Sequence, residues 1–220
     1  MLKRTVDITF AGAALVVLSP LFLLLAVLLK LDSQGPVLYR QTRMGRNFRI
    51  FQILKLRTMR NGEQGAAFTL GADPRITRLG AWLRRWKLDE FPQLWKVLRG
   101  DMSLVGPRPV IPELASEFAA EYSHLLTVRP GLTDPASVQY CHEVDMLSLV
   151  PDPLRYLKTV LTPDKLRISR NYLRTATSAS DFGVIVKTVV ALMTPARRPA
   201  PSSQFESLRP QVSPPSMSQD

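Results

Sequence analysis

The 220-residue sequence has a single cysteine, Cys141, so it forms no disulfide within the chain and no zinc site built from several cysteines. One cysteine also fits a reducing compartment. The sequence shows no glycine-rich phosphate loop, no heptad pattern and no repeat of about 20 to 50 residues. Nothing therefore points to a P-loop enzyme, a coiled coil or a solenoid.

Acidic residues are scarce as well. The chain holds 18 Asp and Glu against 29 Lys and Arg, which gives a formal net charge of +11. Such an excess favours anionic partners, namely nucleic acid, anionic lipid or phosphorylated small molecules. Hydrophobic residues make up 45% of the chain, enough for a sizeable core. The length suits one domain with appendages.

A long apolar run from Ile8 to Leu29 contains 22 residues without a charge. As a straight helix it would measure roughly 33 Å and cross a bilayer. However, Ser19-Pro20 interrupts it, and proline kinks or breaks a helix. Both flanks are basic, which favours the same side of the membrane for each. Two topologies follow: a spanning helix, or a re-entrant helix in which the Ser19 hydroxyl satisfies a freed backbone group.

The rest of the chain predicts an α+β fold, a small and mainly helical globular domain at residues 33–194. Short extended stretches are expected at 37–39 and 48–56, and a polar loop at 60–74. A basic helix at 74–86 carries tryptophans beside arginines, which suits an interfacial amphipathic helix in the headgroup layer. An ordinary core-facing helix with a solvated basic face is the alternative. Residues 195–220, rich in proline and serine, predict a disordered tail.

Later segments give clearer signals for some elements than for others. Pro112 opens a predicted helix with Leu114, Phe118, Tyr122 and Leu125 on one face. Pro130-Gly131 favours a type II turn. Residues 141–174 have a mixed pattern, and residues 181–193 predict an apolar helix.

The stretch KLDEFPQLW sets Asp89 and Glu90 side by side. They are the only two acids between Pro74 and Gly100, against seven Lys and Arg. Pro92 favours the first turn of a helix, so one interpretation is a capping aspartate followed by a first-turn glutamate.

The same helix start is also a site for anions, with Arg84 before it and Arg108 in a loop after it. Two adjacent carboxylates can hold Mg²⁺ together with substrate phosphates. A carboxylate kept ionised by nearby cations can attack phosphorus and form an acyl phosphate. Asp89 and Glu90 therefore predict a phosphoryl-transfer site at a membrane surface.

At this point the sequence resembles the bacterial sugar transferase family, the monotopic phosphoglycosyl transferases. The resemblance rests on KRTVDI with the later Ser-Pro, and on GPVLYRQTRMGRNFRIFQILKLRTM, DPRITRLGAWLRRWKLDEFPQLWKVLRGDMSLVGPRP and RPGLTDPASVQY. It implies transfer of a sugar 1-phosphate from a nucleotide-sugar, commonly a UDP-sugar, to polyprenyl (undecaprenyl) phosphate, as the first membrane step of exopolysaccharide, O-antigen or other glycoconjugate synthesis. It also makes residues 1–32 a re-entrant membrane helix broken at Ser19 and Pro20, and residues 33–194 a catalytic domain at the cytoplasmic face of the bacterial inner membrane.

The resemblance implies roles for individual residues. Asp89 is the expected nucleophile, forming an aspartyl-phosphosugar intermediate, and Glu90 is expected to support Mg²⁺ beside it. Arg84 and Arg108 are expected to contact phosphates. From their charge alone, and apart from the resemblance, Lys55 and Arg57 are expected to contact either the diphosphate or lipid headgroups.

Within the resemblance, Asp134 and Pro135 stand where many relatives have Gly-Trp, which leaves the role of that loop open. The expected partners are a nucleotide-sugar, polyprenyl phosphate and the membrane, with no nucleic acid and a possible homo-oligomer. The competing hypotheses are direct attack by the lipid phosphate while Asp89 and Glu90 only hold Mg²⁺, and a membrane-anchored basic protein that binds anionic lipid or nucleic acid without catalysis.

Overall fold

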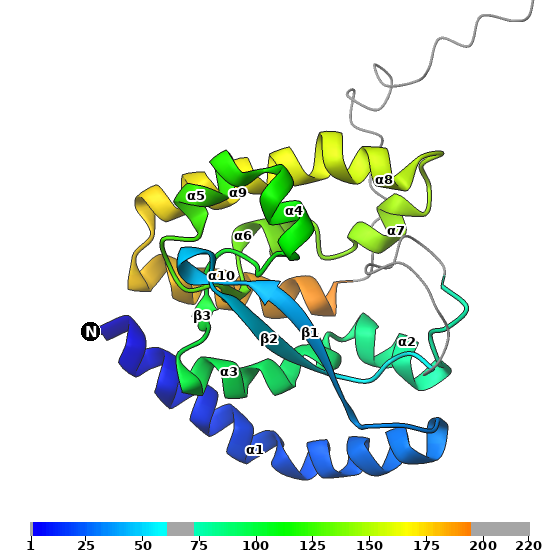
Figure 1. Cartoon of the computed structure of the whole chain (residues 1–220). Helices are drawn as coiled ribbons and strands as arrows, with labels where there is room; N and C mark the ends of the chain where they lie inside the picture. The colour runs from blue at the N-terminus through cyan, green and yellow to red at the C-terminus, as the bar shows by residue number, and fades with distance from the viewer. Residues whose placement is uncertain (1, 61–72, 195–220) are drawn as a thin grey trace, which may run out of the picture.

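The computed structural model describes residues 2–60 and 73–194 (Figure 1). These residues form mostly helices with two small two-stranded sheets, which confirms the expected mainly helical α+β class. Most of the predicted polar loop at 60–74, and all of the predicted tail at 195–220, lie outside the described residues.

The first helix, α1 (Leu2–Asp32), continues through Ser19 and Pro20, and Figure 1 shows it bending midway. Pro20 has no N–H to donate to the carbonyl of Val16, one turn earlier. The Ser19 hydroxyl donates to that carbonyl at 2.8 Å, as predicted. The proline thus bends α1 while a neighbouring side chain replaces the missing hydrogen bond. Within the described residues, α1 is the one helix long and apolar enough to cross a membrane.

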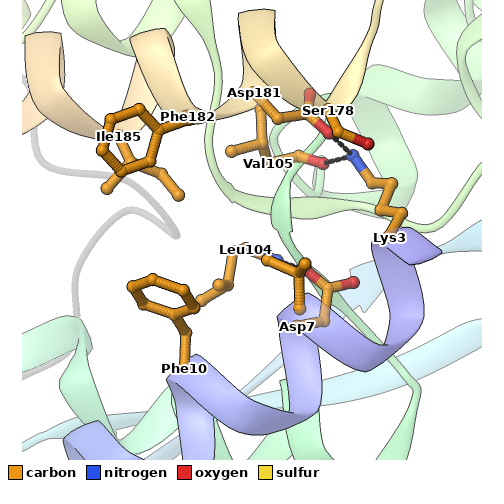
Figure 2. A pocket seen from close by; sticks show the side chains of 10 residues that line it. Lys3, Asp7, Phe10, Leu104, Val105, Ser178, Asp181, Phe182 and Ile185 are labelled. Atoms are coloured by element: carbon orange, nitrogen blue, oxygen red, sulfur yellow. Dashed lines mark hydrogen bonds and ion pairs between the residues drawn. The ribbon is translucent and has the colours of Figure 1, made fainter.

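The N-terminal end of α1 is fastened to the globular domain by polar contacts (Figure 2). The Lys3 ammonium donates to the Asp181 carboxylate at 2.6 Å and to the carbonyl of Val105 at 2.8 Å. The buried Asp7 carboxylate accepts the backbone N–H of Leu104 at 3.0 Å. Beyond these contacts, Phe10 and Phe182 line an apolar cleft between α1 and the last helix, α10 (Ser178–Met193).

The C-terminal end of α1 is held by the same domain. The buried Arg57 guanidinium donates to the carbonyls of Leu29, Ser33 and Pro36 at 2.6–2.7 Å. It thereby ties the last turn of α1 and the loop that follows it to the end of the hairpin. Between the two ends, large apolar side chains of α1 stay exposed, namely those of Val16, Val17, Leu23, Leu24 and Val27.

A β-hairpin follows α1 and passes between two groups of helices (Figure 1). Its strands are β1 (Leu38–Met44) and β2 (Ile50–Leu56), antiparallel in a register that pairs Leu38 with Leu56. A short turn, η1 (Arg46–Phe48), joins them. Ile53 of β2 packs in one apolar cluster with α1 and α3, while Met44 of β1 packs in another with α5 and α9. Both predicted extended stretches are therefore strands, although the first is longer than expected.

The next elements carry the acidic pair. Helix α2 (Arg78–Arg85) is capped by the Thr77 side chain, so it begins later than the predicted residue 74. Its Leu83 is buried in a cluster with α1 and β2, whereas Trp82 and Trp86 remain exposed. A 3-10 turn, η2 (Leu88–Gln93), leads into α3 (Leu94–Arg99), which Gly100 ends in the left-handed conformation as predicted.

The predicted turn at Pro130-Gly131 is wrong, because Gly131 begins a strand. β3 (Ser103–Val105) and β4 (Gly131–Thr133) form a parallel pair, with Ser103 opposite Gly131. A Cβ on Gly131 would lie 2.1 Å from the backbone nitrogen of Gly106. Glycine is required here by the close approach of two chain segments, not by a turn.

Of the helices that remain, the one from Pro112 contacts β1, and α10 contacts both strands of the small parallel sheet. The predicted helix from Pro112 is split at Phe118 into α4 (Pro112–Glu117) and α5 (Ala119–Leu125). Residues after β4 are helical too, in the order α6 (Pro135–Gln139), α7 (Glu143–Leu147), α8 (Pro153–Tyr156), the π-helical η3 (Leu157–Leu161), α9 (Thr162–Thr175) and α10.

Candidate active site

Asp89 and Glu90 lie in the first turn of η2, and both are buried. Lys87, just before this turn, has φ 54°, a left-handed conformation that is uncommon for a residue with a side chain. Phe91, just after the pair, packs edge-to-face against Phe22 of α1 with 6.3 Å between ring centroids. The acidic pair is thus fixed between the hairpin and α1.

Two cations converge on one oxygen of Glu90. The Lys55 ammonium of β2 donates to Glu90 Oε1 at 2.9 Å. The Arg108 guanidinium, from the loop after β3, donates to the same oxygen. The structure therefore brings together Lys55, Glu90 and Arg108, three residues that the sequence predicted for the site.

The two acids respond differently to their surroundings. Burial acts to raise the pKa of Glu90, but Arg108, Lys55 and Lys87 outweigh it and hold that pKa well below its usual range. Burial raises the pKa of Asp89, and the negative charge of Glu90 raises it further, against the opposing effect of Lys55 and other cations. Glu90 is thus the fixed anion of the pair, and Asp89 is the acid with the less stabilised charge.

Asp89 does not act as a helix cap. The N-cap residues of η2 and α3 are Lys87 and Gln93, and neither forms a capping hydrogen bond through its side chain. The Oδ1 atom of Asp89 is buried and has no hydrogen-bond partner among the described residues. Buried polar atoms without partners are rare in native structures and are often explained by a catalytic role or a bound ion.

The two other predicted arginines are placed differently. Arg84 of α2 donates to the Thr58 hydroxyl at 2.8 Å, and its charge interacts with those of Asp89 and Glu90. Arg57 instead donates to the carbonyls at the end of α1 described above. Arg84 therefore belongs to the surroundings of the acidic pair. The hydrogen bonds of Arg57 give it a structural role and do not support the predicted phosphate contact.

A Mg²⁺ ion is compatible with this pair. The described residues contain no group of three or more His, Cys, Asp or Glu that would enclose a metal. Mg²⁺ needs no such cage, because it commonly keeps several waters and binds through one or two carboxylates plus substrate phosphates. The unpartnered Oδ1 of Asp89 is a hard oxygen ligand of the required kind. Asp89 with Glu90 therefore fits a magnesium ion shared with a phosphorylated substrate.

Residues that the sequence reading did not select also surround the pair. Glu143 of α7 is held by Lys165 of α9, and its charge interacts with that of Arg108. Arg43 of β1 lies close enough to Glu90 and Arg108 for their charges to interact. The sequence signal that could have identified Arg43 is the alternation of side chains along β1. This alternation places Arg43 on the same face as Tyr39, which lies opposite Lys55.

Asp134 has a structural position. Its buried carboxylate caps α6 by accepting the backbone N–H of Ser137 at 2.7 Å, and it accepts the Ser169 hydroxyl at 2.6 Å. Pro135 occupies the first turn of α6, where proline is favoured. The Asp-Pro departure thus builds a capped helix start.

Comparison with known proteins places these features in a family. Residues 1–195 match the family model for bacterial sugar transferases. An undecaprenyl-phosphate glucose phosphotransferase of Komagataeibacter xylinus is 45% identical over 145 residues, covering 62% of this chain and 27% of that relative. Exopolysaccharide production protein PSS of Rhizobium leguminosarum bv. phaseoli is 45% identical over 148 residues, covering 63% of this chain and 74% of that relative.

The similarity to another relative extends over most of the chain. A UDP-glucose:undecaprenyl-phosphate glucose-1-phosphate transferase of Caulobacter vibrioides is 39% identical over 198 residues, 87% of this chain and 70% of that relative. The chain therefore spans between 27% and 74% of the length of these three relatives. Because the family model covers all but the last residues, the chain belongs to the bacterial sugar transferase family.

Proposed function

We propose that this protein transfers a sugar 1-phosphate from a nucleotide-sugar, most simply a UDP-sugar, to polyprenyl phosphate at a membrane. The observation that carries this proposal is the difference in hydrogen bonding and ion pairing between two adjacent carboxylates. Glu90 is held as an anion by Lys55 and Arg108, whereas Asp89 has a buried oxygen without a hydrogen-bond partner. The names of the relatives agree with this substrate class.

In the first step, a carboxylate oxygen of Asp89 attacks the phosphorus that bears the sugar. The bond from this phosphorus to the bridging oxygen breaks, and the nucleoside monophosphate leaves with the electron pair. Asp89 then carries the sugar phosphate as an acyl phosphate. Arg84 and Arg108 bind the phosphate oxygens and stabilise their charge. Mg²⁺, when bound by Asp89 and Glu90, supplies further charge neutralisation on the diphosphate.

In the second step, an oxygen of polyprenyl phosphate attacks the same phosphorus. The bond to Asp89 breaks, which regenerates the carboxylate and yields a polyprenyl diphosphosugar. Hydrolysis of the acyl phosphate would compete with this step. Burial of Asp89 limits the access of water, and this protects the intermediate until the lipid arrives.

The geometry of α1 supports a membrane position for this reaction. Both of its ends are fastened to one globular domain, at Lys3 and at Arg57, and its exposed apolar residues lie between them. A helix that spans a bilayer separates its ends by the membrane thickness, so two attachments to one domain favour a re-entrant helix. We place the domain at the cytoplasmic face of the bacterial inner membrane, because basic residues flank both ends of α1.

Labelling without an acceptor tests the covalent route. Purified protein is incubated with Mg²⁺ and a panel of UDP-sugars labelled in the sugar, and both labelled protein and released UMP are measured. We expect label to be retained on the wild-type chain and on Asp101→Asn, whose aspartate pairs with Lys96 away from the acidic pair. We expect no label on Asp89→Asn.

The second candidate reaction, direct attack by the lipid phosphate, gives a different result. It predicts UMP release only after polyprenyl phosphate is added, and no labelled protein at any time. A protein that only binds anions predicts no UMP under any condition and an affinity that falls steeply with salt. The buried, unpartnered Oδ1 of Asp89 supports a catalytic role over simple anion binding, and the labelling result decides between the covalent and the direct route.

A further inference from the structure

One face of the β1–β2 hairpin lies toward the acidic pair, Asp89 and Glu90. The register places Tyr39 opposite Lys55 and Arg43 opposite Phe51, and directly opposed residues of an antiparallel pair share a face. Tyr39 and Arg43 are four residues apart on one strand, so they also share that face. Lys55 on the same face donates to Glu90. Arg43 is therefore directed to the side of the sheet on which the acidic pair lies.

Arg43 has no ion-pair partner on that side among the described residues. Its guanidinium donates to the side-chain oxygen of Gln41 at 2.7 Å, a neutral acceptor. Its Nε is buried without a hydrogen-bond partner, and Arg43 forms no ion pair with any residue in the described ranges 2–60 and 73–194. Burial and the positive charge of Arg108 together lower its pKa to about 10, against the opposing effect of Glu90. A buried guanidinium normally has an ionic or fully hydrogen-bonded partner.

The carboxylate whose charge interacts with that of Arg43 belongs to Glu90, which already has two cationic partners. Glu90 accepts hydrogen bonds from both Lys55 and Arg108. The loop that carries Arg108 is fixed beside Arg43, because the backbone N–H of Met44 donates to the carbonyl of Val110 at 2.8 Å. Lys55 and Arg108 thus both pair with Glu90, and Arg43 beside them adds a positive charge that has no ion pair among the described residues, which suits an anion from outside the chain.

We propose that Arg43 and Arg108 form an anion subsite on the hairpin side of Glu90. This subsite holds the diphosphate of the nucleotide donor. This inference rests on the proposed function for the identity of the ligand. Arginine suits the role because its planar fork of N–H donors matches phosphate oxygens. The subsite would also hold the nucleoside monophosphate as it leaves, since that group keeps one of the two phosphates.

The test compares two arginines of the same strand. Arg43→Gln removes the charge from the site, Arg43→Lys keeps a charge but loses the fork, and Arg40→Gln removes an exposed arginine directed to the other face of β1. The full-length protein is purified in detergent. The rise in its melting temperature on adding UDP, and separately inorganic pyrophosphate, is then measured. This rise reports ligand binding independently of the starting stability of each variant.

We expect Arg43→Gln to bind UDP about tenfold more weakly, the scale of one hydrogen bond to a charged group. At a UDP concentration near 100 times the wild-type Kd, a tenfold loss cuts the stabilisation by UDP to about half. Arg43→Lys should fall between, and Arg40→Gln should match the wild type. In turnover, the KM for the UDP-sugar should rise in Arg43→Gln while the KM for polyprenyl phosphate stays constant.

Wild-type UDP binding by folded Arg43→Gln would overturn the subsite and leave the proposed function intact. If Arg43→Gln does not fold, Arg43→Lys decides, and normal UDP binding by this variant overturns the subsite. Failure of the proposed function has a separate signature, namely no UMP release by the wild type from any UDP-sugar. In that case the subsite is still tested by comparing the stabilisation of Arg43→Gln and Arg40→Gln by UDP and by pyrophosphate.

Discussion

Asp89 and Glu90 are adjacent in the chain, yet their carboxylates meet opposite electrostatic conditions. Arg108 and Lys55 converge on Glu90 and hold its pKa well below the usual range. Burial and the charge of Glu90 together raise the pKa of Asp89. One acid is thereby fixed as an anion, and the charge of the other is left available for a substrate or a metal ion.

Opposite effects on stability are expected from neutralising the two acids. A raised pKa in the folded state means that the ionised Asp89 destabilises the fold at pH values above that pKa. Asp89→Asn should therefore raise the melting temperature at pH 7 by a few degrees, the shift that about 1 kcal/mol produces in a domain of this size. The gain should vanish at a pH below the ordinary value of 3.8, where both states are protonated. Thermal melting across pH measures this.

Glu90→Gln should act in the other direction. The depressed pKa of Glu90 contributes stability that is present above its unfolded value of 4.5 and is lost as pH falls through the folded pKa. Glu90→Gln leaves Lys55 and Arg108 without their shared anion, which costs about 2 kcal/mol at neutral pH. Equal melting temperatures for wild type and Glu90→Gln at pH 7 would contradict the ion-pair arrangement. Both variants should lose transfer activity, by on the order of 10³-fold or more for Asp89→Asn.

The acid limb of the pH–rate profile should report Asp89. A nucleophilic carboxylate must be ionised, so kcat/KM for the UDP-sugar should fall as pH drops through the pKa of Asp89. This pKa is raised above 3.8, and Glu90 contributes to the rise. In Glu90→Gln the residual activity should therefore show an acid limb displaced to lower pH. If the acid limb of Glu90→Gln lies at the same pH as in the wild type or at a higher pH, then the group that titrates is not Asp89.

Membrane topology can be measured with single cysteines. In a Cys141→Ser background, Leu2→Cys and Ser33→Cys place one thiol at each end of α1. Because both ends are attached to one domain, both thiols should resist a membrane-impermeant reagent added to intact cells and react after lysis. Labelling of either thiol from outside would establish a spanning helix.

Two glycines should respond oppositely to alanine. A Cβ at Gly131 would lie 2.1 Å from a backbone atom of Gly106, so Gly131→Ala must separate β3 from β4 and should destabilise the protein strongly. A Cβ at Gly183 within α10 meets nothing within 4 Å. Gly183→Ala should stabilise the protein by about 0.5–1 kcal/mol, the helix-propensity difference. Denaturant unfolding of both variants checks this, and a neutral Gly131→Ala would exclude the close strand pairing.

Local sequence signals predicted the elements whose causes are local. Gly100 ends α3 because a left-handed residue is needed there, and the Ser19 hydroxyl compensates for Pro20 within one turn of α1. The predicted turn at Gly131 failed for the opposite reason. Its strand exists only through pairing with Ser103, 28 residues earlier, and no local pattern encodes a partner at that distance.

The sequence alone determined that an isolated acidic pair lies among cations, next to an apolar segment with a proline in its middle. It could not assign partners to individual charges, because an ion pair depends on where the fold brings distant segments together. Arg57 and Lys55 differ by two positions, yet one holds the end of α1 and the other holds Glu90. Arg108 reaches the same oxygen only because the loop after β3 lies against β1. The tertiary structure therefore decided which acid is held as an anion by ion pairs and which remains available for chemistry.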